Sequence, residues 1–116
     1  MVCYTLQYIL LMYKVYLLEC GDKYKIGYTR NSIEKRIKQM KTGNSEELKL
    51  LGFFESRWGT KIEAHLHRRY KSKKVSGEWF ELEETDILTF ELQCKLWHDV
   101  LEDIANNSTW VLNKKY

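Results

Sequence analysis

Two short segments near the start of the chain are rich in aliphatic and aromatic residues. They are Tyr13–Glu19 and Lys23–Thr29, and Gly21-Asp22 lies in the turn between them. Short apolar runs of this kind are typical of strands, and a turn that begins with glycine favours a type II′ hairpin. Because a two-residue turn fixes the register, the spacing predicts an antiparallel hairpin in which Tyr16 lies opposite Gly27.

The alternation of side chains along this hairpin predicts one buried face. Residues on that face are the more apolar set: Val15, Leu17, Tyr24, Ile26 and Tyr28. The opposite face then carries Tyr16 with its hydroxyl uncovered above Gly27, where a phosphate of another molecule can approach. The alternative is that Gly27 marks a bulge and that Tyr16 is an ordinary strand residue.

Apolar residues at helical spacing predict a first helix after the hairpin. Ser32 is a suitable N-cap, the apolar stripe is Ile33, Ile37 and Met40, and Gly43-Asn44 ends the helix. A third strand, mostly buried, follows at Leu48–Glu55.

A second helix is predicted with Thr60 as its N-cap and with Ile62, Leu66 and Tyr70 on one face. The basic loop 71–74 follows, and after it Trp79-Phe80 is expected to anchor the core, with stacking on a nucleic-acid base as the alternative.

The longest predicted helix spans Asp86 to Ala105, with Thr85 as its cap and Asn106-Asn107-Ser108 at its end. Its apolar stripe is formed by Leu88, Leu92, Leu96 and Val100. We expect Trp97, Leu101 and Trp110 to pack in the core, with a homodimer or a protein partner as the alternative use of this helix.

Together these elements predict an α/β (α+β) fold in the order β-β-α-β-α-α, with a small central antiparallel three-stranded sheet flanked by helices. The chain of 116 residues is long enough for one domain. We expect an N-terminal extension at 1–11, the domain at 12–106 and a tail at 107–116.

The apolar start of the chain does not predict a membrane span. Lys14 interrupts the run, and no basic segment or cleavage site of a secretory signal is present. We therefore expect no membrane partner and an intracellular, cytoplasmic protein, or one in the host cytoplasm if it is viral. Cys3, Cys20 and Cys94 are widely spaced, so reduced structural cysteines are favoured over a zinc site.

Charge is distributed unevenly along the chain. From Lys14 to Lys41 there are eight basic residues against three acidic ones, and from Arg57 to Lys74 there are seven against Glu63 alone. Residues 78–103 carry nine acidic residues against one lysine. This asymmetry favours a surface that binds nucleic acid, although an ordinary mixed surface is the alternative.

The stretch "KVYLLECGDKYKIGYTR", the helix "IEKRIKQM" and the downstream "KIEAHLHRRYKSKKVSGEWFEL" occur in a recognisable order. This order resembles the GIY-YIG nuclease superfamily, in particular a phage and virus branch with a G-E-W-F element. The resemblance spans Met12 to Leu82, and the domain at 12–106 is expected to be a nuclease domain of this type. Lys25 stands where most members have their second motif tyrosine.

The resemblance implies a DNA endonuclease that hydrolyses phosphodiester bonds with one divalent metal ion, Mg²⁺, for which Mn²⁺ can substitute. It implies that Tyr16 activates the attacking water, that Arg36 stabilises charge on the phosphate and that Glu63 holds the metal. Lys25 and His67 complete the expected catalytic set.

Two of these roles also follow from the residues themselves. Arg36 lies about 60° around its helix from Ile33 and can reach the sheet, where a guanidinium suits a phosphate oxygen. An isolated carboxylate among bases, Glu63, is expected to stay ionised and is a hard ligand for Mg²⁺. The alternatives are a surface arginine and a simple Glu63–His67 helix pair.

Gly27 and the basic residues are expected to lie against the nucleic acid and to bind it with low sequence specificity. The basic residues are Lys35, Lys38, Lys41, Arg68, Arg69, Lys71, Lys73 and Lys74. Two other functions are compatible with the sequence: a nucleic-acid-binding module that has lost its chemistry at Lys25, and a viral protein-interaction factor on the same fold.

Overall fold

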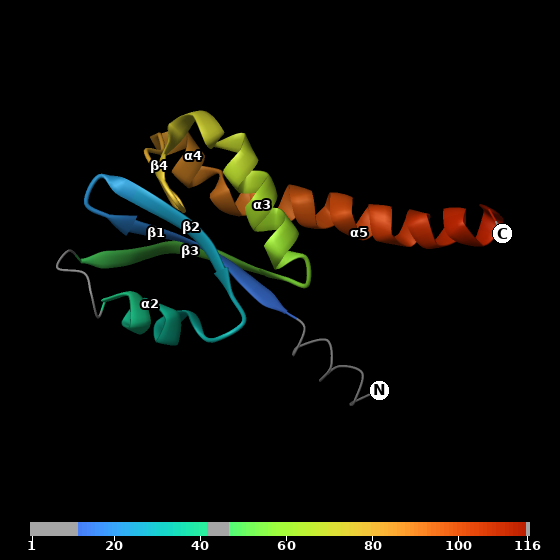
Figure 1. Ribbon diagram of the computed structural model, residues 1–116, viewed down its shortest axis with the longest axis horizontal. Helices are drawn as coiled ribbons and strands as arrows, with labels where there is room; N and C mark the ends of the chain where they lie inside the picture. Colours follow the sequence, from blue (N-terminus) through green and yellow to red (C-terminus); the bar gives the residue numbers. More distant parts are fainter. Residues whose placement is uncertain (1–11, 42–46, 116) are drawn as a thin grey trace.

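The computed structural model describes residues 12–41 and 47–115, with side chains as far as Asn107. Its centre is an antiparallel sheet of five strands in the order β3-β1-β2-β5-β4 (Figure 1). The strands are β1 (Tyr13–Cys20), β2 (Lys23–Thr29), β3 (Leu48–Ser56), β4 (Lys74–Ser76) and β5 (Trp79–Phe80). The predicted α+β class is confirmed, whereas the prediction of three strands is wrong.

The hairpin of β1 and β2 has the predicted register, with Tyr16 opposite Gly27 and Leu17 opposite Ile26. Gly21 in the turn adopts a φ of 62°, and Asp22 has no positive φ. That combination is the one that a glycine-first turn requires, because only glycine adopts positive φ without steric cost.

β4 and β5 were not predicted from the sequence because they are only three and two residues long. β4 and β5 pair across a turn at Gly77, whose φ is 55°. β5 extends the sheet by pairing with one end of β2, through Tyr24 with Phe80 and Lys25 with Trp79. The other residues of β2 do not pair with β5 along that edge, so other groups can contact them there.

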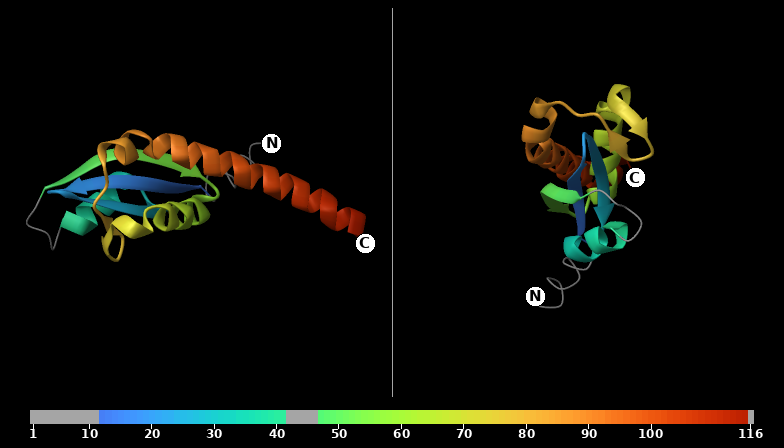
Figure 2. Two further views of the ribbon diagram at one scale, coloured as in Figure 1. Left: turned by 90° about the horizontal axis from the view of Figure 1, so that it is seen from above. Right: turned by 90° about the vertical axis from the view of Figure 1, so that its left-hand side faces the viewer.

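Helices cover both faces of the sheet (Figure 2, right). On one face lies α2 (Ile33–Lys41); on the other lie α3 (Gly59–Arg69), α4 (Glu84–Leu88) and α5 (Phe90–Lys115), and a 3-10 turn, η1 (Lys71–Lys73), follows α3.

The expectation of a single buried face is therefore wrong. Tyr16 and Leu18 are 1% and 0% exposed because they pack against Ile33 and the partly buried Ile37 and Met40. Tyr28, expected in the core, is 43% exposed and contacts Tyr13 edge-on.

Only one of the three predicted helix N-caps is confirmed. Ser32 accepts a hydrogen bond from the amide of Lys35 at 3.2 Å, which confirms it as a cap of α2. Thr60 and Thr85 are not caps, because α3 begins after Trp58 and because Glu83 and Asp86 form a capping box on α4. The predicted helix end at Gly43-Asn44 and the extension at 1–11 lie outside the described residues.

The long C-terminal helix differs from its prediction in three ways. Thr89 separates α4 from α5, and α5 continues through 106–108 to Lys115, beyond the sheet (Figure 1). The predicted stripe of Leu88, Leu92, Leu96 and Val100 is 44–74% exposed. The helix instead packs on the core through a second set at helical spacing: Phe90, Cys94, Trp97 and Leu101. Core packing of Trp97 and Leu101 is thereby confirmed.

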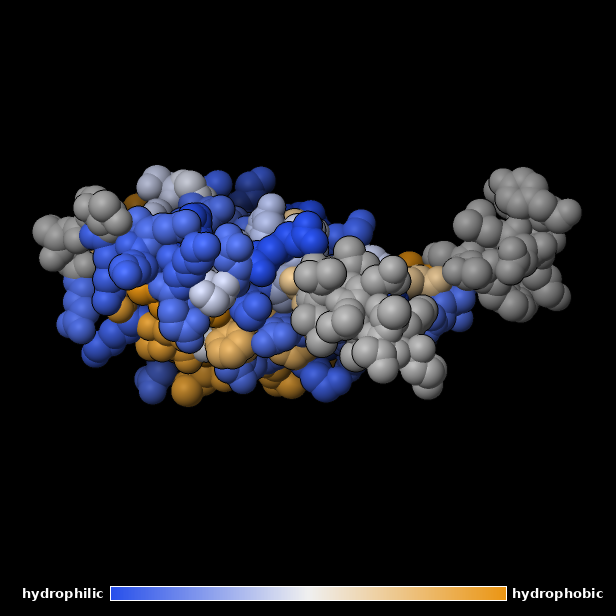
Figure 3. Space-filling model, turned by 90° about the horizontal axis from the view of Figure 1, so that it is seen from below, coloured by the Kyte–Doolittle hydropathy of each residue, from blue (hydrophilic) through white to orange (hydrophobic). Residues whose placement is uncertain are grey.

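The face covered by α2 is mainly hydrophilic, with hydrophobic atoms gathered toward its lower margin (Figure 3). On this face the register places Leu50 and Phe53 of β3 beside Leu18 and Tyr16, and these two side chains stay about 40% exposed, at 39% and 42%. α2 therefore covers β1 but does not reach the edge strand. Among the described helices, none has the length and apolar character needed to cross a bilayer.

Polar contacts fix the middle of α5 to the end of β3. The hydroxyl of Ser56 lies 2.7 Å from Nδ1 of His98. Arg57 donates two hydrogen bonds to the carboxylate of Glu102, at 2.6 and 3.0 Å, and the indole of Trp58 donates a third at 2.6 Å. These contacts hold α5 against the end of β3, near Leu101, the last of its side chains that pack on the core.

We expect Glu102→Gln to destabilise the protein by about 1 kcal/mol at pH 7, since it weakens charge-assisted hydrogen bonds at a partly exposed site. The hydrogen bonds from Arg57 and Trp58 hold the pKa of Glu102 below its ordinary value of 4.5. The stabilisation is therefore present above pH 4.5 and is lost as pH falls through the lowered folded-state pKa. Chemical denaturation at pH 7 and pH 3 measures it. Asp99→Asn removes an exposed ion pair with Lys95 and is the control. If both variants lose the same stability, Glu102 does not anchor α5.

Candidate functional site at the edge of β2

The candidate site lies where β5 stops pairing with β2. The amide of Ile26 donates to the carbonyl of Glu78 at 3.2 Å, and the carbonyl of Ile26 accepts a hydrogen bond from Nε2 of His67 at 2.8 Å. These two bonds bring the β4–β5 turn and α3 to the same residue of β2. Side chains from β1, β2, α2, α3 and this turn consequently gather around Gly27.

Tyr16 fills the space that Gly27 leaves. A Cβ atom at position 27 would lie 2.5 Å from the Tyr16 hydroxyl oxygen and 2.7 Å from its Cζ. The strand pairing runs through this position without a register shift, so Gly27 marks no bulge. The expectation of an uncovered hydroxyl is wrong in this structure, and the glycine is required because a phenol packs directly on the backbone.

Arg36 reaches the sheet from α2, as its position on the helix suggested. Its Nε donates to the Tyr16 hydroxyl at 3.4 Å. The pKa of Arg36 is raised by this bond and by the nearby Tyr16, and to a smaller extent by the charge of Glu78. A permanently charged guanidinium therefore borders the phenol oxygen.

Lys25 and Glu78 form an ion pair beside the same phenol. Lys25 Nζ lies 3.0 Å from Glu78 Oε1 and 5.4 Å from the centre of the Trp79 ring. The Lys25 side chain is only 13% exposed, whereas that of Glu78 is 42% exposed. The lysine that replaces the expected tyrosine thus places a cation at the centre of the site.

Glu63 and His67 approach from α3. His67 Nε2 lies 3.8 Å from Glu63 Oε1, and its ring meets Phe80 edge-on at 4.9 Å. The Glu63 carboxylate is not isolated, because it pairs with His67. Burial raises the pKa of Glu63, and the charge of Glu78 raises it further, against His67 and Lys25, which lower it. His67 is fixed to β2 through Ile26, so it orients the α3 side of the site.

The predicted phosphate contacts fall into two groups on opposite faces of the sheet. Lys35, Lys38 and Lys41 lie on α2, whereas Arg68, Arg69, Lys71 and Lys74 lie at the end of α3 and in the segment after it. Lys73 is engaged within the protein, since its Nζ lies 2.5 Å from Asp86 and 3.8 Å from Glu83. The α2 group lies on the same helix as Arg36.

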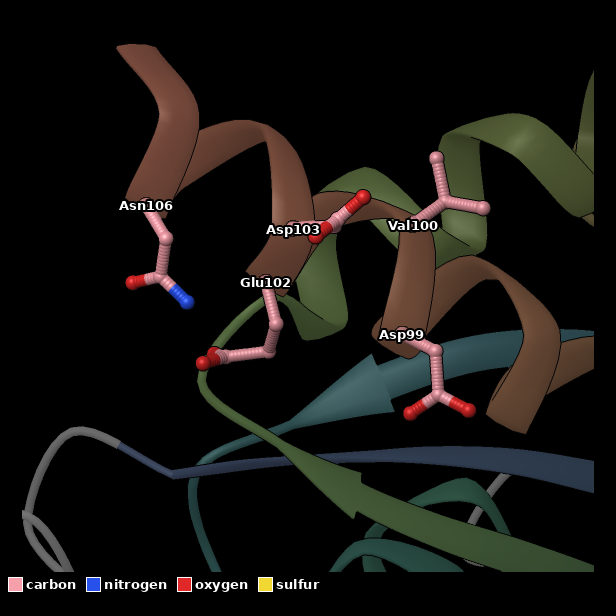
Figure 4. Close-up of a pocket in the computed structure, with 5 residues that line it drawn as sticks. All are labelled: Asp99, Val100, Glu102, Asp103 and Asn106. Carbon is pink, nitrogen blue, oxygen red and sulfur yellow. The ribbon is translucent and has the colours of Figure 1, made fainter. Parts of the chain in front are cut away.

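Other sites in the described residues offer less chemistry. A hollow along α5 is lined by Asp99, Val100, Glu102, Asp103 and Asn106 (Figure 4). It lies away from the cluster around Gly27, and two of its carboxylates already pair with Lys95 and Arg57. Burial raises the pKa of Cys94 to about 12, so its thiol stays protonated.

Glu78 is the one member of the cluster that sequence reasoning did not assign. The G-E-W-F element was noted, but the two short strands that carry it were not predicted, so nothing placed Glu78 beside Lys25. The available signal was the neighbouring Gly77, which marks a turn that can return the chain to the hairpin.

We expect Gly27→Ala to destabilise the fold by about 1–3 kcal/mol, because the new methyl group meets a buried ring that must shift. Gly52→Ala is a matched control, since a Cβ there meets the end of the flexible Glu91 side chain at 3.0 Å. Thermal and denaturant unfolding of both variants measure the difference. Equal costs at the two glycines contradict the close packing of Tyr16 on Gly27.

Comparison with known families gives one match. The model of the T5orf172 domain matches residues 8–104. No curated protein and no solved structure matches the chain at a significant level. The interpretation of the chain as a GIY-YIG nuclease is therefore wrong as a family assignment, because the matching family is a different one, although related to the GIY-YIG and HNH-like nuclease-associated domains. With residues 8–104 matched, the chain belongs to the T5orf172 domain family.

Proposed function

We propose that this protein is a DNA endonuclease that hydrolyses phosphodiester bonds with the help of one divalent metal ion, Mg²⁺ or Mn²⁺. One observation carries the proposal: Tyr16, Lys25 and Arg36 come from three different elements and converge around Gly27, and Glu63 of a fourth element joins them through His67, which is bonded to the neighbouring Ile26. Two cations, a phenol and a partly buried carboxylate in one place form a set suited to a phosphate ester.

Each side chain has a distinct task in this proposal. In its ionised form the Tyr16 phenol is a base that takes a proton from the attacking water. Arg36 orients the phenol oxygen at 3.4 Å and presents its remaining donors to a phosphate oxygen. Lys25, largely shielded from solvent, adds a second charge that stabilises the negative charge of the transition state.

Glu63 is the residue that would hold the metal ion. Its carboxylate is buried enough for its pKa to be raised, so a nearby cation would offset the cost of its charge. The described residues contain no group of three or more His, Cys, Asp or Glu side chains arranged to enclose a metal. A single carboxylate such as Glu63 suits Mg²⁺, which binds through one or two carboxylates and keeps several waters. Such an ion supplies Lewis-acid stabilisation of phosphate charge.

Basic residues on both sides of the site support nucleic acid as the substrate. Those on α2 continue outward from Arg36, and they would contact phosphates without reading bases. Low sequence specificity follows from such contacts. Specificity supplied by a second copy or a protein partner at α5 stays a prediction.

Nicking of supercoiled plasmid, together with DNA binding, tests the proposed function. We expect the wild-type protein to nick DNA with Mg²⁺ and not in EDTA, and to bind DNA in both. Binding without nicking at any divalent metal would support the binding module that has lost its chemistry. Absence of both nicking and binding would support the protein-interaction factor.

A further inference from the structure

Glu78 places a carboxylate among the groups assigned above to the phosphate. Its Oε1 is 3.0 Å from Lys25 Nζ and 3.1 Å from the position a Cβ of Gly27 would occupy. The Tyr16 hydroxyl lies 2.5 Å from that same position. Glu78 also contributes to the raised pKa of Arg36, after Tyr16. An anion therefore already sits beside Lys25 and the phenol.

Burial shows which of these groups can yield to a substrate. Tyr16 is 1% exposed, so nothing from solvent reaches its hydroxyl unless a neighbour moves. Lys25 and Gly27 belong to β2 in the middle of the sheet, and Arg36 belongs to α2. The Glu78 side chain is 42% exposed, against 13% for Lys25, and Glu78 follows Gly77, in the turn between the two shortest strands. The Glu78 side chain is the group that is best placed to swing out.

We propose that Glu78 is an internal phosphate mimic, which occupies the place of a substrate phosphate beside Lys25 and is displaced when nucleic acid binds. This inference rests on the proposed function, because it assumes that the same cluster receives a phosphate. Two anions cannot share the position without strong repulsion. A polyanion held by the basic residues around the site displaces Glu78, whereas a small isolated anion has no such additional contacts. Glu78 thereby favours nucleic acid over free phosphate.

The test compares Glu78→Gln with Glu81→Gln, which makes the same change of charge three residues away on an exposed side chain. Affinity for a short DNA duplex and for inorganic phosphate is measured in EDTA, so that no cleavage is needed. We expect Glu78→Gln to bind both probes at least about tenfold more tightly, the effect of freeing one charged hydrogen-bond partner. Glu81→Gln is expected to change either affinity by less than about threefold, as rim charges do.

Equal changes in the two variants overturn the inference, and so does weaker binding by Glu78→Gln, which would make Glu78 a ligand or a fixed structural partner. If Glu78→Gln does not fold, the carboxyl ¹³C signal of Glu78 in the wild-type protein decides the question. Saturating duplex should shift this signal as the pair with Lys25 breaks, and an unchanged signal contradicts displacement. If Glu78→Gln binds more tightly but the wild-type protein does not nick DNA, the assignment of Glu78 as a phosphate mimic stands and only the proposed hydrolysis is wrong.

Discussion

Glu63→Gln is expected to abolish Mg²⁺-dependent DNA cleavage, with a loss of at least about 10³-fold, because it removes the charge that would hold the metal. DNA binding in EDTA should change little, since the carboxylate does not contact phosphate in the proposed site. The measurement is single-turnover cleavage of a labelled duplex across a Mg²⁺ titration. Glu55→Gln, on the exposed side of β3, is the control.

The same substitution should not weaken the fold. Burial raises the pKa of Glu63 above its ordinary value of 4.5, so its ionised form is disfavoured in the native state. Above pH 4.5 the charge therefore costs stability, and this cost is absent at lower pH, where the carboxyl is protonated in both states. We expect the midpoint of Glu63→Gln at pH 7 to equal or exceed that of the wild type. Undiminished cleavage by a folded Glu63→Gln protein would remove the metal assignment.

Tyr16→Phe is expected to lower the cleavage rate by at least about 10²-fold, the low end for a lost general base. The ring keeps its packing on Gly27, and the hydroxyl loses a long hydrogen bond from Arg36, at 3.4 Å. Stability should therefore fall by less than about 1 kcal/mol. DNA affinity should be unchanged, because the hydroxyl acts on water.

A second tyrosine variant separates a chemical from a structural role of the Tyr16 hydroxyl. Tyr28→Phe removes a hydroxyl from a tyrosine that is 43% exposed, and it should keep the wild-type cleavage rate. A wild-type rate in Tyr16→Phe would make Tyr16 a packing residue only.

The sequence was sufficient to predict the features that depend on local chemistry. Turn residues set the register of the hairpin, which places Tyr16 opposite Gly27. Ser32 and helical spacing located α2, and with it the direction of Arg36 toward the sheet. These features depend on neighbours in the chain, so a single sequence determines them.

Features that depend on competition between distant segments were not predictable in this way. All four residues of the run Val15–Leu18 are apolar, which is typical of a strand buried on both faces. The prediction of one buried face came instead from the alternation of apolar and polar residues along the rest of the hairpin. On α5 two apolar stripes compete, and the one that contains Phe90 and Trp97 packs on the core. Strands of two and three residues are too short to show an alternation of apolar and polar residues, so the position of Glu78 beside Lys25 could be found only in the structure.

A double-mutant cycle of Tyr16→Phe and Arg36→Lys, measured by single-turnover DNA cleavage with Mg²⁺, tests most directly whether the residues around Gly27 form one catalytic unit. Because groups that act together are strongly non-additive, we predict that the double variant is about as slow as the slower single variant. Multiplied effects, as expected for independent residues, or cleavage by the double variant at the wild-type rate, would contradict this account.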